Sequence, residues 1–176
     1  MIQKTSRKQF IATGLATVTG LLLPAKFSYA VNQTQQPDPI KPELVKEFVS
    51  ACHSKFDRVK EMLAENHLLL HVSWDWGGGD FETGIEAAGH MGDKEIADYL
   101  LGKGARYNIF IAAMYGNLEV VKNILTAQPQ LLNAKGPHGF TLLHHASKGG
   151  ETAKSVLDYL TGLGAKETNV GFHTKP

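Results

Sequence analysis

The chain repeats one pattern, and this repetition constrains its fold more than any other feature of the sequence. The clearest copy is Phe110–Leu125, which reads FIAAMYGNLEVVKNIL, and weaker copies occupy residues 48–63, 86–101 and 144–160. In each copy small residues come first, a break near Gly or Ser follows, and an amphipathic run ends in two apolar residues. Self-similarity of this kind predicts stacked units, in which each helix pair buries an apolar face against the next. The predicted fold class is therefore all-α.

The apolar residues of each copy recur at the three-and-four spacing of one helix face, which predicts two helices in each unit. Small residues such as Ala87, Ala88, Ala112 and Ala113 would keep the short first helices of neighbouring units close together. The predicted helices are 43–52, 56–63, 83–91, 94–102, 109–115, 118–127, 141–148 and 151–161.

Three short segments carry a resemblance to a known family. Thr141–Ala146 reads TLLHHA, Gly116–Val121 reads GNLEVV, and a Gly-Ala pair follows two of the second helices, at 104–105 and 164–165. These residues resemble the TPLHxA start, the second helix and the closing turn of ankyrin repeats, with Leu142 in place of the proline. The resemblance covers about residues 43–167 and implies an α-solenoid of about four stacked ankyrin-type helix pairs with irregular connecting loops. It also implies that His144 ties neighbouring turns together by hydrogen bonds.

The spacing of the copies departs from the family's. Ala88 and Ala112 are 24 residues apart and Ala112 and Ala146 are 34 apart, against about 33 in ankyrin repeats. Residues Arg106–Asn108 are therefore too few for the usual β-hairpin between units. The first connection is longer and contains Trp74–Asp80, which reads WDWGGGD. This segment resembles that of a group of exported bacterial ankyrin proteins of unassigned activity, so the resemblance implies a fold but no reaction.

The first 30 residues have the pattern of a secretory signal. Lys4, Arg7 and Lys8 precede an apolar run at Phe10–Leu23, and Ser28-Tyr29-Ala30 has the small-x-small form of a cleavage site. The run of 14 residues is shorter than a typical membrane span. We therefore expect a periplasmic or secreted protein with no membrane span after cleavage, with a retained N-terminal anchor as the alternative.

Ser6–Ile11 also resembles the twin-arginine export motif, but Lys8 stands in place of the second arginine, so the general secretory route stays open. After the signal, residues 31–42 are polar, contain three prolines and are predicted to form a flexible leader. The ankyrin-like domain is predicted at residues 43–168, and a loose tail at residues 169–176.

Charge and cysteine content narrow the possible partners. Of 18 basic residues, four lie within residues 1–30, where no acidic residue lies, so the mature chain has 14 basic and 17 acidic residues and a net charge of −3. This balance argues against nucleic acid as a partner. Cys52 is the single cysteine, so the chain forms no internal disulfide, and Cys52 is interpreted as a small buried apolar residue.

The tryptophans and glycines of Trp74–Asp80 have two interpretations. In the first they form a binding loop, because glycines allow sharp turns and aromatic rings supply contact area. In the second they form a structural turn whose tryptophans pack on the first unit. The glycine spacing does not match a phosphate-binding loop. The acids Asp75, Asp80 and Glu82 would give this end of the groove a negative bias.

The eight histidines raise the question of a metal site. No HxxxH pair on a predicted helix and no HExxH motif occurs, so the sequence predicts neither a metal ion nor a cofactor. His67 and His71 are four residues apart, but the leucines between them indicate an extended or turn segment. His53, His90 and His145 fall on or near the face of the first helices that would line a groove.

No catalytic motif is recognisable, so an enzyme is not favoured. We expect a module that binds a protein through its concave groove, with a small-molecule or enzymatic site at the Trp74–Asp80 loop as the alternative. An open, shallow groove would favour the first function, whereas convergence of acids, histidine and tryptophan would favour the second. The candidate binding residues are Trp74, Asp75, Trp76, Asp80, His90, Met91, Met114, Tyr115, His138, His145 and Lys148.

Overall fold

The computed structural model describes residues 38–173 of the chain. The predicted signal at residues 1–30 and most of the predicted leader lie outside these residues. The described part is mostly helical and has one small two-stranded sheet, which confirms the expected predominance of helix. No helix in this part combines the length and the apolar character that crossing a bilayer requires.

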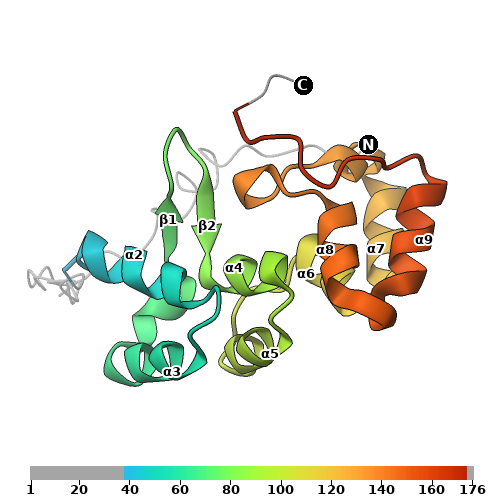
Figure 1. Cartoon of the computed structure of the whole chain (residues 1–176). Coiled ribbons are helices and arrows are strands. Elements are labelled where there is room, and N and C mark those ends of the chain that lie inside the picture. Colours follow the sequence, from blue (N-terminus) through green and yellow to red (C-terminus); the bar gives the residue numbers. More distant parts are fainter. Residues whose placement is uncertain (1–37, 174–176) are drawn as a thin grey trace, which may run out of the picture. The chain divides into compact units, whose positions relative to one another are not determined.

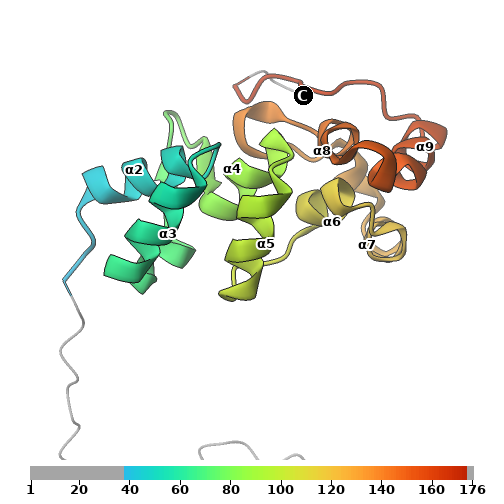
Figure 2. The same ribbon diagram turned by 60° about the horizontal axis from the view of Figure 1, so that its bottom comes forward.

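The α-helices follow one another as pairs (Figures 1 and 2). Within each pair, the first helix (α2, α4, α6 or α8) packs against the α-helix that follows it in the chain. The first helices of neighbouring pairs also touch: α2 contacts α4, α4 contacts α6, and α6 contacts α8. The helices are α2 (Pro42–Ala51), α3 (Phe56–Glu65), α4 (Gly84–Met91), α5 (Lys94–Gly102), α6 (Ile109–Tyr115), α7 (Leu118–Ala127), α8 (Leu142–Gly149) and α9 (Lys154–Gly162). Short 3₁₀ helices connect them at η1 (His67–His71), η2 (Pro129–Asn133), η3 (Pro137–Gly139) and η4 (Gly150–Ala153).

Polar side chains at the helix starts explain why several boundaries agree with the sequence prediction. Asp93, Asn108 and Asn117 each accept a hydrogen bond from a backbone N–H in the first turn of α5, α6 and α7. These bonds satisfy donors that have no partner inside the helix. All three helices have the predicted bounds. The last helix starts later than predicted, at Lys154, because Gly150–Ala153 forms the 3₁₀ turn η4.

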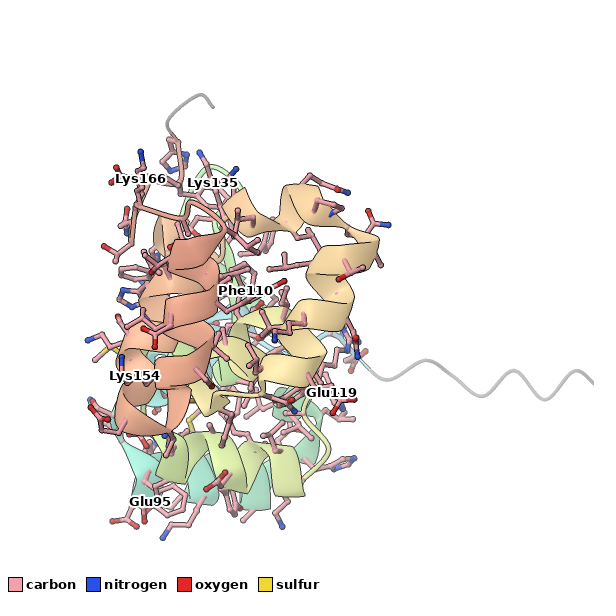
Figure 3. All side chains as sticks on the ribbon, turned by 90° about the vertical axis from the view of Figure 1, so that its right-hand side faces the viewer. Glu95, Phe110, Glu119, Lys135, Lys154 and Lys166 are labelled. Carbon is pink, nitrogen blue, oxygen red and sulfur yellow. The ribbon has the colours of Figure 1, made fainter. Side chains whose placement is uncertain are left out.

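The buried apolar side chains form two clusters that meet at α6. Ile111 and Met114 belong to the cluster of α2 to α5, whereas Ala112 and Ala113 belong to the cluster of α7 to α9. Charged side chains such as Glu95, Glu119 and Lys154 lie at the periphery, as Figure 3 shows. Helix α6 packs against helices on two sides. The small residues Ala112 and Ala113 allow the close approach on the side of the second cluster.

A β-hairpin interrupts the helices between η1 and α4. Strands β1 (Ser73–Asp75) and β2 (Phe81–Thr83) are antiparallel, and Trp74 lies opposite Glu82. Sequence analysis places a turn here but does not predict strands. Within the described residues Arg106–Asn108 forms no strand, as the spacing of the copies predicts.

The first residues of the predicted tail are held in place. Thr141 N–H donates to the Thr168 carbonyl, Val170 N–H donates to the Gly139 carbonyl, and the Asn169 side chain donates to the His138 carbonyl. This strand-like contact differs from the expected loose tail at residues 169–176. It anchors the loop Gly136–Phe140, which carries His138.

Replacing Ala112 by leucine should destabilise the protein by about 1–3 kcal/mol, because Ala112 is fully buried between packed helices. Chemical denaturation measures the free energy of unfolding. Ala127→Leu, at an exposed position of α7, is the control and should have little effect. Equal stability of the two variants would contradict the close packing at α6.

Candidate metal centre

The Trp74–Asp80 segment forms the tip of the hairpin. The Asp75 carboxylate accepts hydrogen bonds from the backbone N–H groups of Gly77 and Gly79, at 2.8 and 3.1 Å. Gly78 has a φ of 65°, and a Cβ atom there would lie 2.7 Å from the His173 ring, so any other residue would be strained and would displace that ring. The glycines therefore serve both the turn and a close approach to the C-terminal segment.

The hairpin directs Glu82 into the protein. Alternate residues of a strand face opposite sides, and the side chain of Phe81 is exposed while that of Glu82 is fully buried. Glu82 Oε2 accepts a hydrogen bond of 2.7 Å from the Trp76 indole N–H. Glu82 Oε1 has no partner with hydrogen-bond geometry among the described residues, although His90 Nε2 lies 2.8 Å from it. A buried carboxylate needs compensating positive charge.

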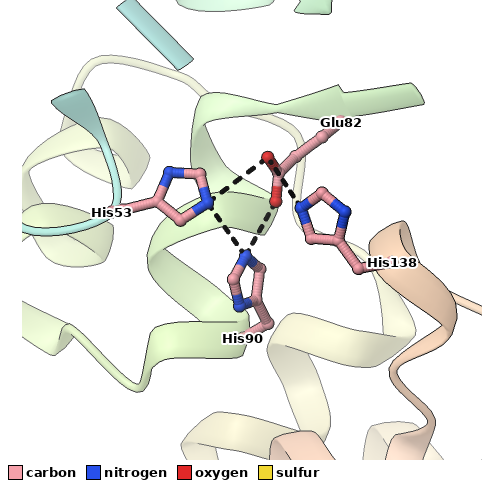
Figure 4. A group of neighbouring side chains, drawn as sticks. All are labelled: His53, Glu82, His90 and His138. Carbon is pink, nitrogen blue, oxygen red and sulfur yellow. Dashed lines mark hydrogen bonds and ion pairs between the residues drawn. The ribbon is translucent and has the colours of Figure 1, made fainter. Parts of the chain in front are cut away.

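Three imidazole rings converge on this carboxylate, as Figure 4 shows. His90 lies in the last turn of α4, and its Nε2 is 3.2 Å from Nε2 of His53, which follows α2. The Nε2 atoms of His53 and His138 are each 3.5 Å from Glu82 Oε2. The ligand atoms of these four residues all lie within 4.8 Å of one another.

A second set of contacts orients the rings. His53 Nδ1 donates to the Val49 carbonyl at 3.0 Å, and His138 Nδ1 lies 2.9 Å from Asp80 Oδ2. When Nδ1 of a neutral imidazole carries the proton, Nε2 presents its lone pair. His53 and His138 therefore both aim a lone pair at the region of Glu82 Oε2.

Asp80 holds His138 by two bonds. Its Oδ1 accepts from the His138 backbone N–H at 2.8 Å, and its Oδ2 accepts from the ring. His138 has a φ of 59°, a left-handed conformation that is uncommon for residues other than glycine. The surroundings thus impose a costly backbone conformation on the residue that completes the group.

The His53 lone pair accepts a hydrogen bond when His90 carries its proton on Nε2, but the buried Glu82 carboxylate still needs compensating positive charge. Protons on the histidines would supply it, and so would a metal ion. Metal-binding histidines usually donate their other ring N–H to a carboxylate or a carbonyl, and metal-binding carboxylates are hydrogen-bonded in turn. Val49, Asp80 and Trp76 supply these outer contacts. The arrangement therefore has the donor atoms and the supporting contacts of a metal site.

The structure brings together four of the residues predicted for binding. Trp76, Asp80, His90 and His138 meet at this group, and Asp75 shapes the adjoining turn. Trp74 instead packs against the N-terminal core, as the structural interpretation predicts. The remaining surface candidates, Met91, Tyr115 and Lys148, do not belong to the group of four residues at Glu82. Met91 and Lys148 are exposed, and the Tyr115 hydroxyl donates to Asp98 of α5.

Met114 and His145 are corrections to the candidate list. Both side chains are fully buried, so neither lines a groove on the surface. Met114 packs in the N-terminal cluster because α6 turns that side toward α4. His145 Nδ1 donates to the Thr141 carbonyl at 2.8 Å, one turn earlier in α8.

The burial of His145 predicts a pH-dependent stability. Desolvation lowers its pKa from 6.5 to about 4, against a smaller opposite effect of the Thr141 carbonyl. The unfolded chain then binds the proton more readily than the folded one, so stability is fully present above pH 6.5 and falls between pH 6.5 and 4. His145→Phe should reduce the loss of unfolding free energy between pH 7 and 4 by about 3 kcal/mol.

Urea denaturation at both pH values, with a chelator present, measures that difference. The exposed His67→Gln variant should keep the dependence of the parent protein. An unchanged pH dependence in His145→Phe would contradict the assignment.

Two other features near the group do not belong to it. Cys52 is buried, and burial with the nearby Glu82 charge raises the pKa of its thiol, so it remains a protonated apolar residue. His144 Nε2 donates to the His90 carbonyl at 2.8 Å, which ties α8 to α4. The Phe140 ring stacks between the rings of His90 and His144, with centroid distances of 5.0 and 4.0 Å.

An apolar cavity lies elsewhere. It has a volume of about 500 Å³ and is lined mainly by leucines of α3 and η1, with Tyr99 and Lys103 from the region of α5. His67 and His71 also border it, but they are not part of the histidine group at Glu82.

Sequence analysis did not predict this grouping: it placed His53 near the groove and Glu82 among the acids at its end, but it included neither among the candidate binding residues. The four residues come from the end of α2, from β2, from α4 and from η3, so no short motif contains them. One signal was present: His53 and His90 occupy positions within one residue of each other in adjacent copies of the repeated pattern.

Asp80 should act as a positioning residue for metal binding. Asp80→Ala should weaken the affinity for Zn(II) about 10–100-fold, because His138 loses the acceptor that orients its ring. Competition with a chromophoric chelator measures the affinity. Asp158→Asn, at an exposed position of α9, should bind as the parent protein does. An unaffected Asp80→Ala variant would contradict the positioning role of Asp80.

Comparison with models of known protein families gives no match, and comparison with curated proteins gives none either.

Proposed function

We propose that this protein binds a transition-metal ion through His53, Glu82, His90 and His138. The observation that carries the proposal is the convergence of three imidazole nitrogens on one buried carboxylate, with outer hydrogen bonds that orient two of the rings. Convergence of acids, histidines and tryptophan is also the arrangement that favours a small-molecule or enzymatic site over an open groove.

The distances suit a tetrahedral ion. Bond lengths of about 2.0–2.1 Å to nitrogen and oxygen imply that neighbouring ligand atoms lie about 3.3 Å apart. The separations among the ligand atoms given above, from His90 Nε2 to His53 Nε2 and from Glu82 to the three rings, are 2.8–3.5 Å. These separations involve both oxygens of Glu82, and the other pairs of ligand atoms lie within 4.8 Å of one another, so binding of an ion would draw the rings toward one carboxylate oxygen.

The donor set narrows the class of metal. Three imidazoles with one carboxylate suit zinc and other first-row transition ions, whereas calcium and magnesium prefer sites made of oxygen atoms. Zn(II) is the first choice because it takes nitrogen and oxygen ligands in a tetrahedron. The protonated Cys52 thiol is not among the ligands.

The fold and the compartment belong to the same proposal. The pairing of helices, with α2, α4, α6 and α8 in successive contact, supports an ankyrin-like stack. Export to the periplasm or beyond rests on the N-terminal sequence pattern. A protein partner remains a second candidate, favoured by the exposed Phe81 and Met91, which flank Glu82 and His90 in the sequence.

Metal binding is tested by calorimetric titration of the chelator-treated full chain with Zn(II), with metal content measured after gel filtration. We expect one ion for each chain. The double variant His53→Ala/His138→Ala should bind none, whereas the matched control His67→Ala/His71→Ala should bind one. Equal binding by both double variants would refute the assignment of the site.

A further inference from the structure

The two sides of the histidine group differ in exposure. Glu82 and His90 form the inner side, with side chains that are 0 % and 5 % exposed. His53 and His138 form the outer side, with side chains that are 24 % and 29 % exposed. An ion held among the four would therefore be enclosed on the side of Glu82 and His90 and least covered on the side of His53 and His138.

The net charge of the ion with its four ligands favours an anion on the outer side. A divalent ion with three neutral imidazoles and the Glu82 carboxylate keeps one net positive charge. The Asp80 carboxylate is hydrogen-bonded to His138 rather than directed at the ion. Zinc ions in catalytic sites can expand from four to five ligands, and an oxygen donor added here would be the fifth ligand beside the four residues.

Trp76 lies beside the same position. Its ring centroid is 6.1 Å from that of His53 and 5.8 Å from that of His138, the two outer rings. The hydrogen bond from its indole N–H to Glu82 holds the ring there, and the residue is 36 % exposed. The outer position thus has an aromatic wall that could cover an apolar group.

We infer that the bound ion keeps an exchangeable coordination position beneath Trp76, which takes the carboxylate of a small organic acid with an apolar or aromatic group. This inference rests on the proposed metal site. It distinguishes a ligand-accepting centre from a purely structural ion, which would be enclosed by protein on every side. The positive charge selects the carboxylate, and Trp76 selects the group attached to it.

Cobalt(II) provides the test, because its visible absorption reports both binding and a change of ligands. The chelator-treated full chain is titrated with Co(II), and then with acetate or benzoate. We expect absorption bands on addition of Co(II), a change in these bands with both acids, and about tenfold tighter binding of benzoate, which covers more apolar area against Trp76.

Two variants separate the roles of Trp76. Trp76→Phe keeps an aromatic ring and should retain the preference for benzoate, although it loses the hydrogen bond to Glu82. Trp76→Ala should bind both acids with similar affinity. If Trp76→Ala does not fold, the comparison of the two acids on the parent chain and on Trp76→Phe still decides the matter.

The outcomes are distinguishable. Absence of cobalt bands would refute the proposed metal site itself. Bands that neither acid changes would leave the metal site in place and overturn the exchangeable position. Equal affinities for acetate and benzoate on the parent chain would overturn the part assigned to Trp76.

Discussion

Saturating Zn(II) should raise the melting temperature of the chelator-treated protein by about 10 °C or more, and His90→Ala should remove this shift. The four ligands are far apart in the sequence, so only the folded chain brings them together. A ligand that binds the folded state alone stabilises it by about 4 kcal/mol at a free concentration of 1,000 times its Kd. For a domain of this size that corresponds to a shift of about 10 °C or more.

His90 is the ligand whose loss should matter most. Its Nε2 is close to both His53 Nε2 and Glu82 Oε1, and its side chain is almost fully buried. Loss of its packing on Phe140 would also lower the melting temperature without metal, so the measured quantity is the shift caused by Zn(II). Differential scanning calorimetry with and without the ion measures it.

His67→Ala is the matched control, because it removes an exposed histidine outside the group, and it should keep the full shift. A His90→Ala protein that Zn(II) stabilises as much as the parent would contradict the metal site.

Glu82→Gln should have opposite effects on metal binding and on the stability of the metal-free protein. The affinity for Zn(II) should fall about 100-fold or more, because the charged ligand is replaced by a neutral amide. Without metal, the variant should be as stable as the parent or up to about 3 kcal/mol more stable, since a buried carboxylate is costly. With the amide oxygen in the place of Oε2 it still accepts from Trp76, and the amide nitrogen in the place of Oε1 then faces His90 Nε2 and can donate to it.

Urea denaturation in the presence of a chelator measures the stability, and calorimetric titration measures the affinity. Glu95→Gln, on the exposed side of α5, should change neither. If Glu82→Gln is clearly less stable than the parent without metal, protonated histidines rather than an ion compensate Glu82. The same experiment therefore separates the two possible sources of positive charge.

Local signals in the sequence determined most of the helices. The bounds of α5, α6 and α7 could be predicted because each begins at a side chain that caps its first turn and has apolar residues at helical spacing. Such interactions join residues within about four positions of each other, so they can be read along the chain. The hairpin was missed because its strands are three residues long, too short for an alternating pattern.

The candidate site could be predicted only in part. Trp76, Asp80, His90 and His138 were selected one by one, for their residue type or for their place in the repeated pattern. Their convergence could not be predicted, because His53, Glu82, His90 and His138 lie on four separate segments and share no local spacing.

The sequence by itself determined the helical class and the positions of most helices, and it marked Trp74–Asp80 as an unusual connecting segment. Only the tertiary structure decided that β2 turns Glu82 inward, that α2 and α4 bring His53 and His90 together, and that Asp80 draws His138 onto them. The physical reason is that the local backbone conformation depends on neighbours in sequence. The grouping of His53, Glu82, His90 and His138 depends instead on how the helices and the hairpin are placed relative to one another, and the packing of their side chains sets that placement.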